Sequence, residues 1–334
     1  MKEWQNPWEQ QKKKGFIRPL VILIVGTFLI GGLGLFMTQP TREQNSPSSV
    51  TVSPVRLKEH VVMLSETLHP RDYTHLKNLN RCTEYIKDTF AEAGAAPESQ
   101  RFEVNGSTYQ NIIGRFGVGK GAKLIIGAHY DSCGNTPGAD DNASGVAGLI
   151  ELARLFQKHP PEREIEMVAY SLEEPPFFGT QNMGSAFHAR SIADSGQKIS
   201  GVIVLEMIGF FSNERGSQRF PNFMLRFFYP SRGNFIGVVG PGNQGDWIKQ
   251  MKIGMRGTTD LPVHSIRAPS IIPGSDYSDH RNYWPYGINA LMITDTAFLR
   301  NRAYHSEHDT ADRLDYERMS KVVIAVFEAV QTLP

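Results

Sequence analysis

The chain has 334 residues, 40% of them apolar, which is enough for one large domain with an appendage or for two small domains. Its 35 Lys and Arg residues balance 34 Asp and Glu residues, so a net charge near +1 gives no support for nucleic-acid binding. Two cysteines, Cys82 and Cys133, exclude a disulfide-dense scaffold and a cysteine-rich zinc module, and they either form one disulfide or stay free.

The first predicted element is a transmembrane anchor over residues 19–37, preceded by a cytoplasmic tail over residues 1–18. Nineteen uncharged residues can cross a bilayer core of roughly 30 Å. Basic residues gather before this run (Lys12, Lys13, Lys14 and Arg18), whereas Arg42 alone follows closely, so the positive-inside rule places the N-terminus in the cytoplasm and the bulk of the chain in the periplasm or outside the cell. The run is longer than the apolar region of about 7–15 residues typical of a signal peptide and ends without a small-residue cleavage site, which favours an uncleaved anchor.

A flexible linker is predicted next, over residues 38–54, because this stretch is polar and rich in Ser, Thr and Pro. The folded domain is expected over residues 55–334. It begins with two packing helices, one carrying Val61 to Leu68 and one over 80–93. A β-hairpin follows over 100–116, with Asn105-Gly106 as its turn.

Four short apolar runs in the rest of the domain each end in a polar residue of chemical interest. They end at His129, at Glu173-Glu174, at Glu206 and at Asp295. Strands buried on both faces read as continuous apolar runs, and parallel strands gather their ligands at their carboxyl ends. We therefore expect these residues to meet at one edge of a mostly parallel sheet.

Helices and further strands are predicted between and after these runs. Residues 143–157 carry apolar residues at helical spacing and form a crossover helix, and residues 316–333 repeat the pattern as the last helix. The region 210–261 is expected to hold a strand at 234–240, a helix at 247–255 and part of the substrate pocket.

Five side chains with metal-ligating chemistry occur in order along the chain: His129 in GAHYDS, Asp140 in GADDNASG, Glu174 in SLEEPP, Glu206 in LEMIG and His305 in YHSEHDT. Two imidazoles and three carboxylates suit a pair of Zn²⁺ ions. A two-metal site needs one carboxylate to bridge ions that lie roughly 3.5–4 Å apart. We predict that Asp140 is this bridge, with His129 and Glu206 on one ion and Glu174 and His305 on the other.

Three further residues have predicted roles in the chemistry. Glu173 is expected to take a proton from a bridging water and to deliver it to the leaving amine. Asp131 is expected to bind the second ring nitrogen of His129 and fix its tautomer. Tyr304 can donate a hydrogen bond to the developing oxyanion or serve only in packing.

Other polar residues near these motifs are expected to be structural. Asp309 is expected to order the loop that carries His305. His264, His280 and His308 are spare once five ligands are assigned. Cys133 is read as a small buried residue beside the site.

The motifs HYDS, GADDNASG, EEPPFFGT, LEMIG, SDH and YHSEHDT together resemble the zinc aminopeptidases of the bacterial leucyl aminopeptidase type, peptidase family 28 of metallopeptidase clan MH. The resemblance covers Leu57 to the C-terminus. It implies a phosphorylase/hydrolase-like α/β three-layer sandwich with a mixed, mostly parallel sheet, and removal of the N-terminal amino acid from peptides. It also implies the five zinc ligands above, Glu173 as the base, and a cis peptide between Asp140 and Asp141.

Alternative functions remain open from the sequence. Glutaminyl cyclases share this fold with a single zinc, but the presence of both His129 and Glu206 argues against cyclisation. Carboxypeptidases and dipeptidases of this type insert a lid domain, whereas the interval from Glu206 to His305 is expected to complete the sheet. A catalytically inactive binding ectodomain should have lost ligands, and none is missing.

Overall fold

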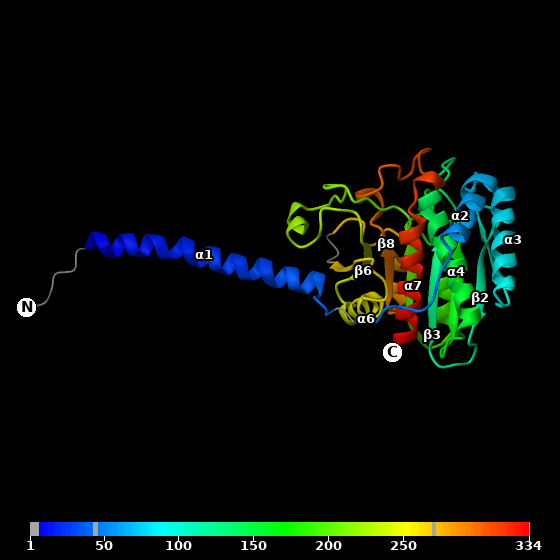
Figure 1. Ribbon diagram of the computed structural model, residues 1–334, viewed down its shortest axis with the longest axis horizontal. Coiled ribbons are helices and arrows are strands. Elements are labelled where there is room, and N and C mark those ends of the chain that lie inside the picture. The colour runs from blue at the N-terminus through cyan, green and yellow to red at the C-terminus, as the bar shows by residue number, and fades with distance from the viewer. Residues whose placement is uncertain (1–6, 43–45, 269–271, 334) are drawn as a thin grey trace, which may run out of the picture.

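An eight-stranded sheet forms the centre of the domain in the computed structural model, which describes residues 7–42, 46–268 and 272–333 (Figure 1). The strand order is β1-β2-β4-β3-β5-β8-β6-β7. The strands are β1 (Glu98–Val104), β2 (Ser107–Phe116), β3 (Lys123–His129), β4 (Ile165–Tyr170), β5 (Ile199–Glu206), β6 (Ile236–Pro241), β7 (Val263–Ala268) and β8 (Ala290–Thr294). Strands β4, β3, β5 and β8 are neighbours and parallel, which confirms that the four apolar runs end at one edge.

Antiparallel pairings make the sheet mixed. Strand β2 pairs antiparallel with β1 and β4, and β6 pairs antiparallel with β8 and parallel with β7. The predicted hairpin is present, and its turn residues Asn105 and Gly106 both have positive φ, 52° and 79°, as a tight hairpin turn requires. Strands β6, β7 and β8 all fall between Glu206 and His305, so this interval completes the sheet as expected.

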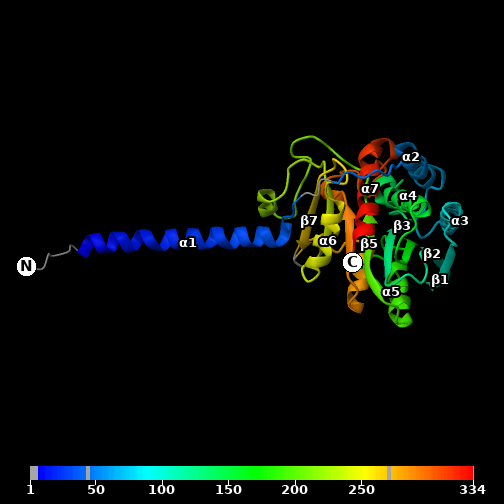
Figure 2. The ribbon, with the colours of Figure 1, turned by 60° about the horizontal axis from the view of Figure 1, so that its bottom comes forward.

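Helices cover both faces of the sheet and give three layers. Successive residues of β3 point to opposite faces, so Leu124 and Ile126 join one buried cluster and Ile125 joins another. The larger cluster packs under α2 (Pro54–Val62), α3 (Leu76–Glu92), α4 (Gly145–Lys158), α6 (Gly245–Met255) and α7 (Tyr316–Thr332). The smaller packs under α5 (Gly184–Ser195) and a 3₁₀ segment, Asp279–Tyr286 (Figure 2). The α/β architecture predicted from the sequence is therefore confirmed.

The N-terminal helix α1 (Pro7–Thr38) projects from the domain as a long rod (Figure 1). Its range includes the predicted anchor and most of the predicted tail. Within the described part of the chain, no helix has the length and apolarity needed to cross a membrane.

The segment after α1, predicted to be a flexible linker, contacts the domain where it is described. The carbonyl oxygens of Thr38 and Gln39 accept hydrogen bonds from Lys252 Nζ at 2.7 and 2.9 Å. The backbone amide of Ser48 donates to the carbonyl of Thr258 at 2.9 Å, and Val52 is buried. These contacts hold the segment against α6 and the residues that follow it.

Candidate active site

The carboxyl ends of β3, β4 and β5 bring the predicted site residues together. His129 and Glu206 are the last residues of β3 and β5, and Glu173 and Glu174 follow the end of β4. Leu172 has a positive φ of 61°, so the chain leaves the strand direction and both glutamates can face the site. The carboxylate of Asp131 accepts hydrogen bonds from the amides of Glu173 and Glu174 at 3.2 and 3.1 Å, which fixes this turn.

Two groups of metal-ligating atoms lie side by side at this edge. In the first, His129 Nε2 lies 3.3 Å from Asp141 Oδ1 and 3.4 Å from Glu206 Oε2. In the second, His305 Nε2 lies 3.1 Å from both Asp141 Oδ2 and Glu174 Oε2. Asp141 thus contributes one oxygen to each group, the position that a bridging carboxylate would take. The predicted pairing of His129 with Glu206, and of Glu174 with His305, matches this geometry.

The structure corrects the predicted bridge, because Asp141 and not Asp140 lies between the imidazoles. Asp140 points into the protein, where its Oδ1 accepts from the amide of Gly209 and its Oδ2 from the side-chain amide of Asn301, both at 3.0 Å. The backbone of Asp141 is non-helical, with φ −104° and ψ 89°, so the neighbouring carboxylates take different directions. The cis peptide is also displaced from its expected position and joins Asp141 to Asn142.

Two buried residues with no predicted role in placing Asp141 hold its segment. Asp309 was expected to order the His305 loop, but its carboxylate accepts hydrogen bonds from the amides of Asp140 and Asp141 at 3.0 to 3.2 Å. Arg71 is completely buried and donates to the carbonyl oxygens of Tyr130 and Gly138 at 2.9 and 2.5 Å. Arg71 gives no motif signal, because its role depends on carbonyl groups about sixty residues away.

Two further contacts orient the ligands of the first group. His129 Nδ1 lies 3.2 Å from the backbone carbonyl of Asp131, whose carboxylate is farther away, at 3.6 Å. Asp131 therefore faces the second nitrogen as predicted, with its carbonyl nearer than its side chain. Ser278 Oγ donates to Glu206 Oε2 at 2.6 Å, and this serine belongs to the SDH motif, which had no assigned role.

The electrostatics of the site favour bound cations. Burial raises the pKa of Glu173 and of Glu206, and it raises the pKa of Glu174 to about 7 with help from the charge of Asp141. The buried carboxyl of Asp279, beside His129, likewise has its pKa raised to about 7. Burial and neighbouring carboxylates thus destabilise the anionic forms of these four acids, and metal cations would reverse this.

Several buried polar atoms of the site have no hydrogen-bond partner in the part of the chain that the structure describes, which indicates whether these residues could hold a metal ion. Among the described residues, His129 Nε2 and both carboxylate oxygens of Glu174 are buried and have no hydrogen-bond partner. Such atoms are costly to bury unless something binds them. Nitrogen and carboxylate oxygen are ligands that Zn²⁺ accepts, so the donor set fits zinc.

An apolar pocket opens beside the first group. Its wall includes Glu206 and Tyr304 together with Phe220, Leu225, Tyr229, Phe235, Ile266, Met292 and Phe298. The region 210–261 supplies several of these side chains, and its role in binding substrate stays a prediction. The Tyr304 ring stacks on the His305 ring with centroids 3.8 Å apart, so Tyr304 lies between the ligand group and the pocket.

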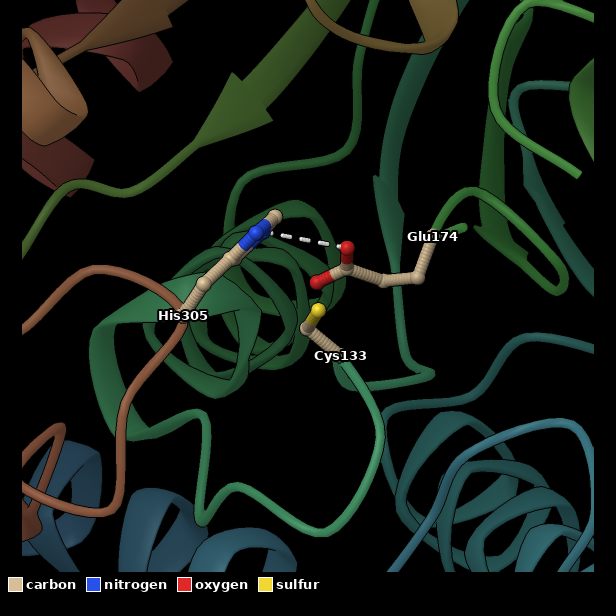
Figure 3. A group of neighbouring side chains, drawn as sticks. All are labelled: Cys133, Glu174 and His305. Atoms are coloured by element: carbon tan, nitrogen blue, oxygen red, sulfur yellow. Dashed lines mark ion pairs between the residues drawn. The ribbon is translucent and has the colours of Figure 1, made fainter. Parts of the chain in front are cut away.

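The remaining polar residues lie as follows. His264 lines the pocket, His280 is buried with Nε2 3.0 Å from the carbonyl of Ser275, and His308 is exposed. Cys82 and Cys133 are both free. Cys133 is half-buried and lies beside Glu174 and His305 (Figure 3).

The chain is similar in sequence to a known peptidase family and to individual proteins. The model of peptidase family M28 matches residues 111–330. The chain is 47% identical over 282 residues to the uncharacterized protein YfbL of Escherichia coli, an alignment that covers 82% of this chain and 86% of that protein. It is 22% identical over 303 residues to leucine aminopeptidase 1 of Uncinocarpus reesii, covering 83% and 69% of the two chains.

Solved structures share the fold. The LapA aminopeptidase of Legionella pneumophila superposes with a TM-score of 0.67 at 19% identity, over 84% of this chain and 72% of that one. A glutaminyl cyclase of Bacteroides thetaiotaomicron bound to N-acetylhistamine superposes with a TM-score of 0.64 at 19% identity, over 85% and 99%. At such low identity the two superpositions establish the architecture and leave the reaction to the site.

Proposed function

This chain belongs to peptidase family M28 and is a zinc metallopeptidase, and from this premise we propose that it is a di-zinc aminopeptidase that releases the N-terminal residue of peptides. The observation that carries the proposal is Asp141, which offers one carboxylate oxygen to each of two ligand groups. His129 and Glu206 would complete one metal position, and Glu174 and His305 the other. Bound zinc supplies Lewis-acid polarisation of the scissile carbonyl and makes a water molecule more acidic.

Glu173 is the proposed general base. Its carboxylate is buried in the site, with Oε2 3.9 Å from His129 Nε2. The amide of Glu173 donates to Asp131, so the backbone that carries this carboxylate is fixed. In the proposed reaction, Glu173 accepts a proton from the attacking water and passes it to the nitrogen of the leaving amine.

Tyr304 and the apolar pocket are the proposed substrate contacts. Tyr304 stacks on His305 and also lines the pocket, so its hydroxyl can donate to the carbonyl oxygen of a substrate whose side chain enters the pocket. The natural partners are then peptides. The pocket walls are mainly apolar, and the whole chain has little net charge, so neither feature suits nucleic acid.

The proposal is tested by metal content and by hydrolysis of aminoacyl-amide chromogens in the parent and in Glu173→Gln. We expect about two zinc ions per chain in both proteins, and a fall in kcat of about 10²–10⁴-fold in the variant. Glu103→Gln, an exposed position on β1, is the matched control and should keep full activity. Binding of a single zinc, or unchanged turnover in Glu173→Gln, contradicts the mechanism.

Glutaminyl cyclase activity is the second candidate, because a solved cyclase shares the fold over 99% of its own chain. The same proteins should be offered a peptide with N-terminal glutamine. Ammonia release without hydrolysis of aminoacyl amides would support cyclisation. We expect hydrolysis, because the ligand atoms of His129 and Glu206 provide a second metal position.

We also propose that the run 19–37, which begins among residues whose side chains the structure does not describe, anchors the enzyme in a membrane with the catalytic domain on the periplasmic or extracellular side. Support comes from the charge-free run 19–37, from the basic residues before it and from exposed apolar side chains such as Ile22, Phe28 and Leu29, which are 70 to 77% exposed. Replacing both Phe28 and Leu29 by Lys should move the chain from the carbonate-resistant membrane fraction to the supernatant. Equal recovery of the parent and the variant in the supernatant would contradict the proposed membrane anchor.

A further inference from the structure

Cys133 reaches the second ligand group from a loop of its own. Its Sγ, a carboxylate oxygen of Glu174 and a ring nitrogen of His305 all lie within 4.8 Å of one another. Figure 3 shows the three side chains converging from three segments, the loop after β3, the turn after β4 and the loop before α7. Cys133 is half-buried, so the thiol borders the site and is not sealed in the core.

A second observation, the unpaired carboxylate of Glu174, points to a bound cation in this group. Glu174 is 3% exposed, yet neither of its carboxylate oxygens has a hydrogen-bond partner among the described residues. His305 Nε2 lies 3.1 Å from Glu174 Oε2, and Asp141 Oδ2 approaches the same nitrogen equally closely, at 3.1 Å. If His305 Nε2 carries no proton, its lone pair faces two carboxylate oxygens and is repelled by them, whereas a shared cation would satisfy all three atoms.

We propose that Cys133 is a metal ligand, binding through its thiolate the ion that Glu174 and His305 hold. This inference rests on the proposed di-zinc function and adds a sulfur donor to one of the two positions. On binding, the S–H bond breaks, its proton passes to solvent, and a sulfur–metal bond forms without any change of oxidation state. Cys82 forms no disulfide with Cys133: it is free and completely buried in α3.

The two metal positions then differ in chemistry. The position at His129 and Glu206 offers nitrogen and oxygen, whereas the position at Cys133 adds a soft donor. Thiolate favours zinc and cadmium over manganese and magnesium, which prefer oxygen ligands. The enzyme should therefore bind cadmium tightly at one position, and Cys133→Ser should weaken that binding at least tenfold while it leaves manganese affinity within about twofold.

The experiment is cobalt substitution of the full-length protein. A cobalt–thiolate bond gives an intense near-ultraviolet charge-transfer band that nitrogen and oxygen ligands do not give. We expect this band in the parent and in Cys82→Ala, the control, and its loss in Cys133→Ser, with cobalt content measured for each protein. A parent with two cobalt ions and no band, or a band that persists in Cys133→Ser, overturns the proposal.

A measurement on the parent alone covers the case in which Cys133→Ser fails to fold. A thiol reagent should modify Cys133 rapidly in the metal-free protein and at least tenfold more slowly after zinc is added, and equal rates overturn the proposal. Hydrolysis of aminoacyl amides by the same cobalt protein separates the two hypotheses. Hydrolysis without the band refutes the thiolate ligand alone, whereas the band without hydrolysis refutes the aminopeptidase alone.

Discussion

At the scale of single residues, the adjacent carboxylates Asp140 and Asp141 take different roles. Asp141 shares its oxygens between His129 and His305. Asp140 instead accepts hydrogen bonds from Gly209 and Asn301 and so ties the loop after β5 to the segment before α4. One residue thus faces the proposed metals while its neighbour holds the backbone.

This division predicts different outcomes for two isosteric substitutions. Asp141→Asn should lose most bound zinc and reduce kcat/KM at least 100-fold, because the amide removes the charge shared by both ligand groups. Asp140→Asn should keep about two zinc ions, because Asp140 does not contact the imidazoles. Zinc content and turnover of the two purified variants decide the matter, and greater zinc loss in Asp140→Asn would restore the original assignment of Asp140 as the bridge.

At the scale of secondary-structure elements, close packing of β3 against β4 places two strand ends. A Cβ atom at Gly127 would overlap the ring of Tyr170, which is buried. The Tyr170 hydroxyl is 2.6 Å from that of Tyr283, so the ring cannot move away freely. The positions of His129 and Glu173 depend on this contact, because both follow these residues closely in the chain.

Gly127→Ala should therefore destabilise the domain by about 1–3 kcal/mol through overpacking. Denaturant melts of the parent and the variant measure the difference. Gly31→Ala in α1, where an added Cβ meets nothing within 4 Å, is the control and should leave the domain's stability unchanged. A melt of Gly127→Ala identical to the parent's would mean that the ring shifts without cost.

A buried ionic network around Glu166 joins the strands β2, β3 and β4 to the helix α5. Glu166 on β4 accepts from Lys123 Nζ at 2.6 Å and Arg115 Nε at 2.7 Å, and it lies 3.1 Å from His188 Nε2 on α5. Burial alone would raise the pKa of Glu166, but the hydrogen bonds and charges of His188 and Lys123 outweigh it and lower the pKa to about 2. The folded chain therefore stabilises the ionised form of Glu166 relative to its protonated form.

The lowered pKa of Glu166 predicts acid sensitivity. Its stabilising contribution is fully present above the unfolded pKa, about 4.3, and is lost as pH falls towards 2. Glu166→Gln should cost about 3–5 kcal/mol at pH 7, because buried Lys123 loses its closer carboxylate partner and keeps only Glu164, 3.4 Å away. Urea melts of chelator-treated protein measure the free energy of unfolding. The difference in this free energy between the parent and Glu166→Gln should narrow below pH 4. A difference that does not change with pH would contradict the lowered pKa of Glu166. Glu103→Gln is the exposed control.

At the scale of the whole molecule, the site concentrates negative charge where three parallel strands end. Asp141, Glu173, Glu174, Glu206 and Asp279 are all buried. Bound cations should therefore stabilise the folded chain and not only catalyse the reaction.

Chelation should lower the melting temperature by roughly 5–15 °C, and added zinc should restore it. Thermal melts with and without chelator measure the shift. Asp141→Asn should show a much smaller shift, since it has little metal to lose. A parent melt that is insensitive to chelator would exclude tight metal binding.

The sequence by itself predicted the parallel core, the crossover helix, the hairpin and most of the site. Buried parallel strands are apolar on both faces, so the polar residues that end them mark one edge of the sheet. His129, Glu174 and Glu206 could be placed in this way, because their positions depend on strand ends.

Only the tertiary structure decided the residues whose roles depend on loops. Periodicity does not report the dihedral angles that turn Asp141 and not Asp140 towards the imidazoles. Arg71, Ser278 and Asp309 act through partners distant in the chain, and Cys133 reaches Glu174 and His305 only when three loops converge. Local patterning determines secondary structure and burial, whereas long-range packing determines which side chains meet.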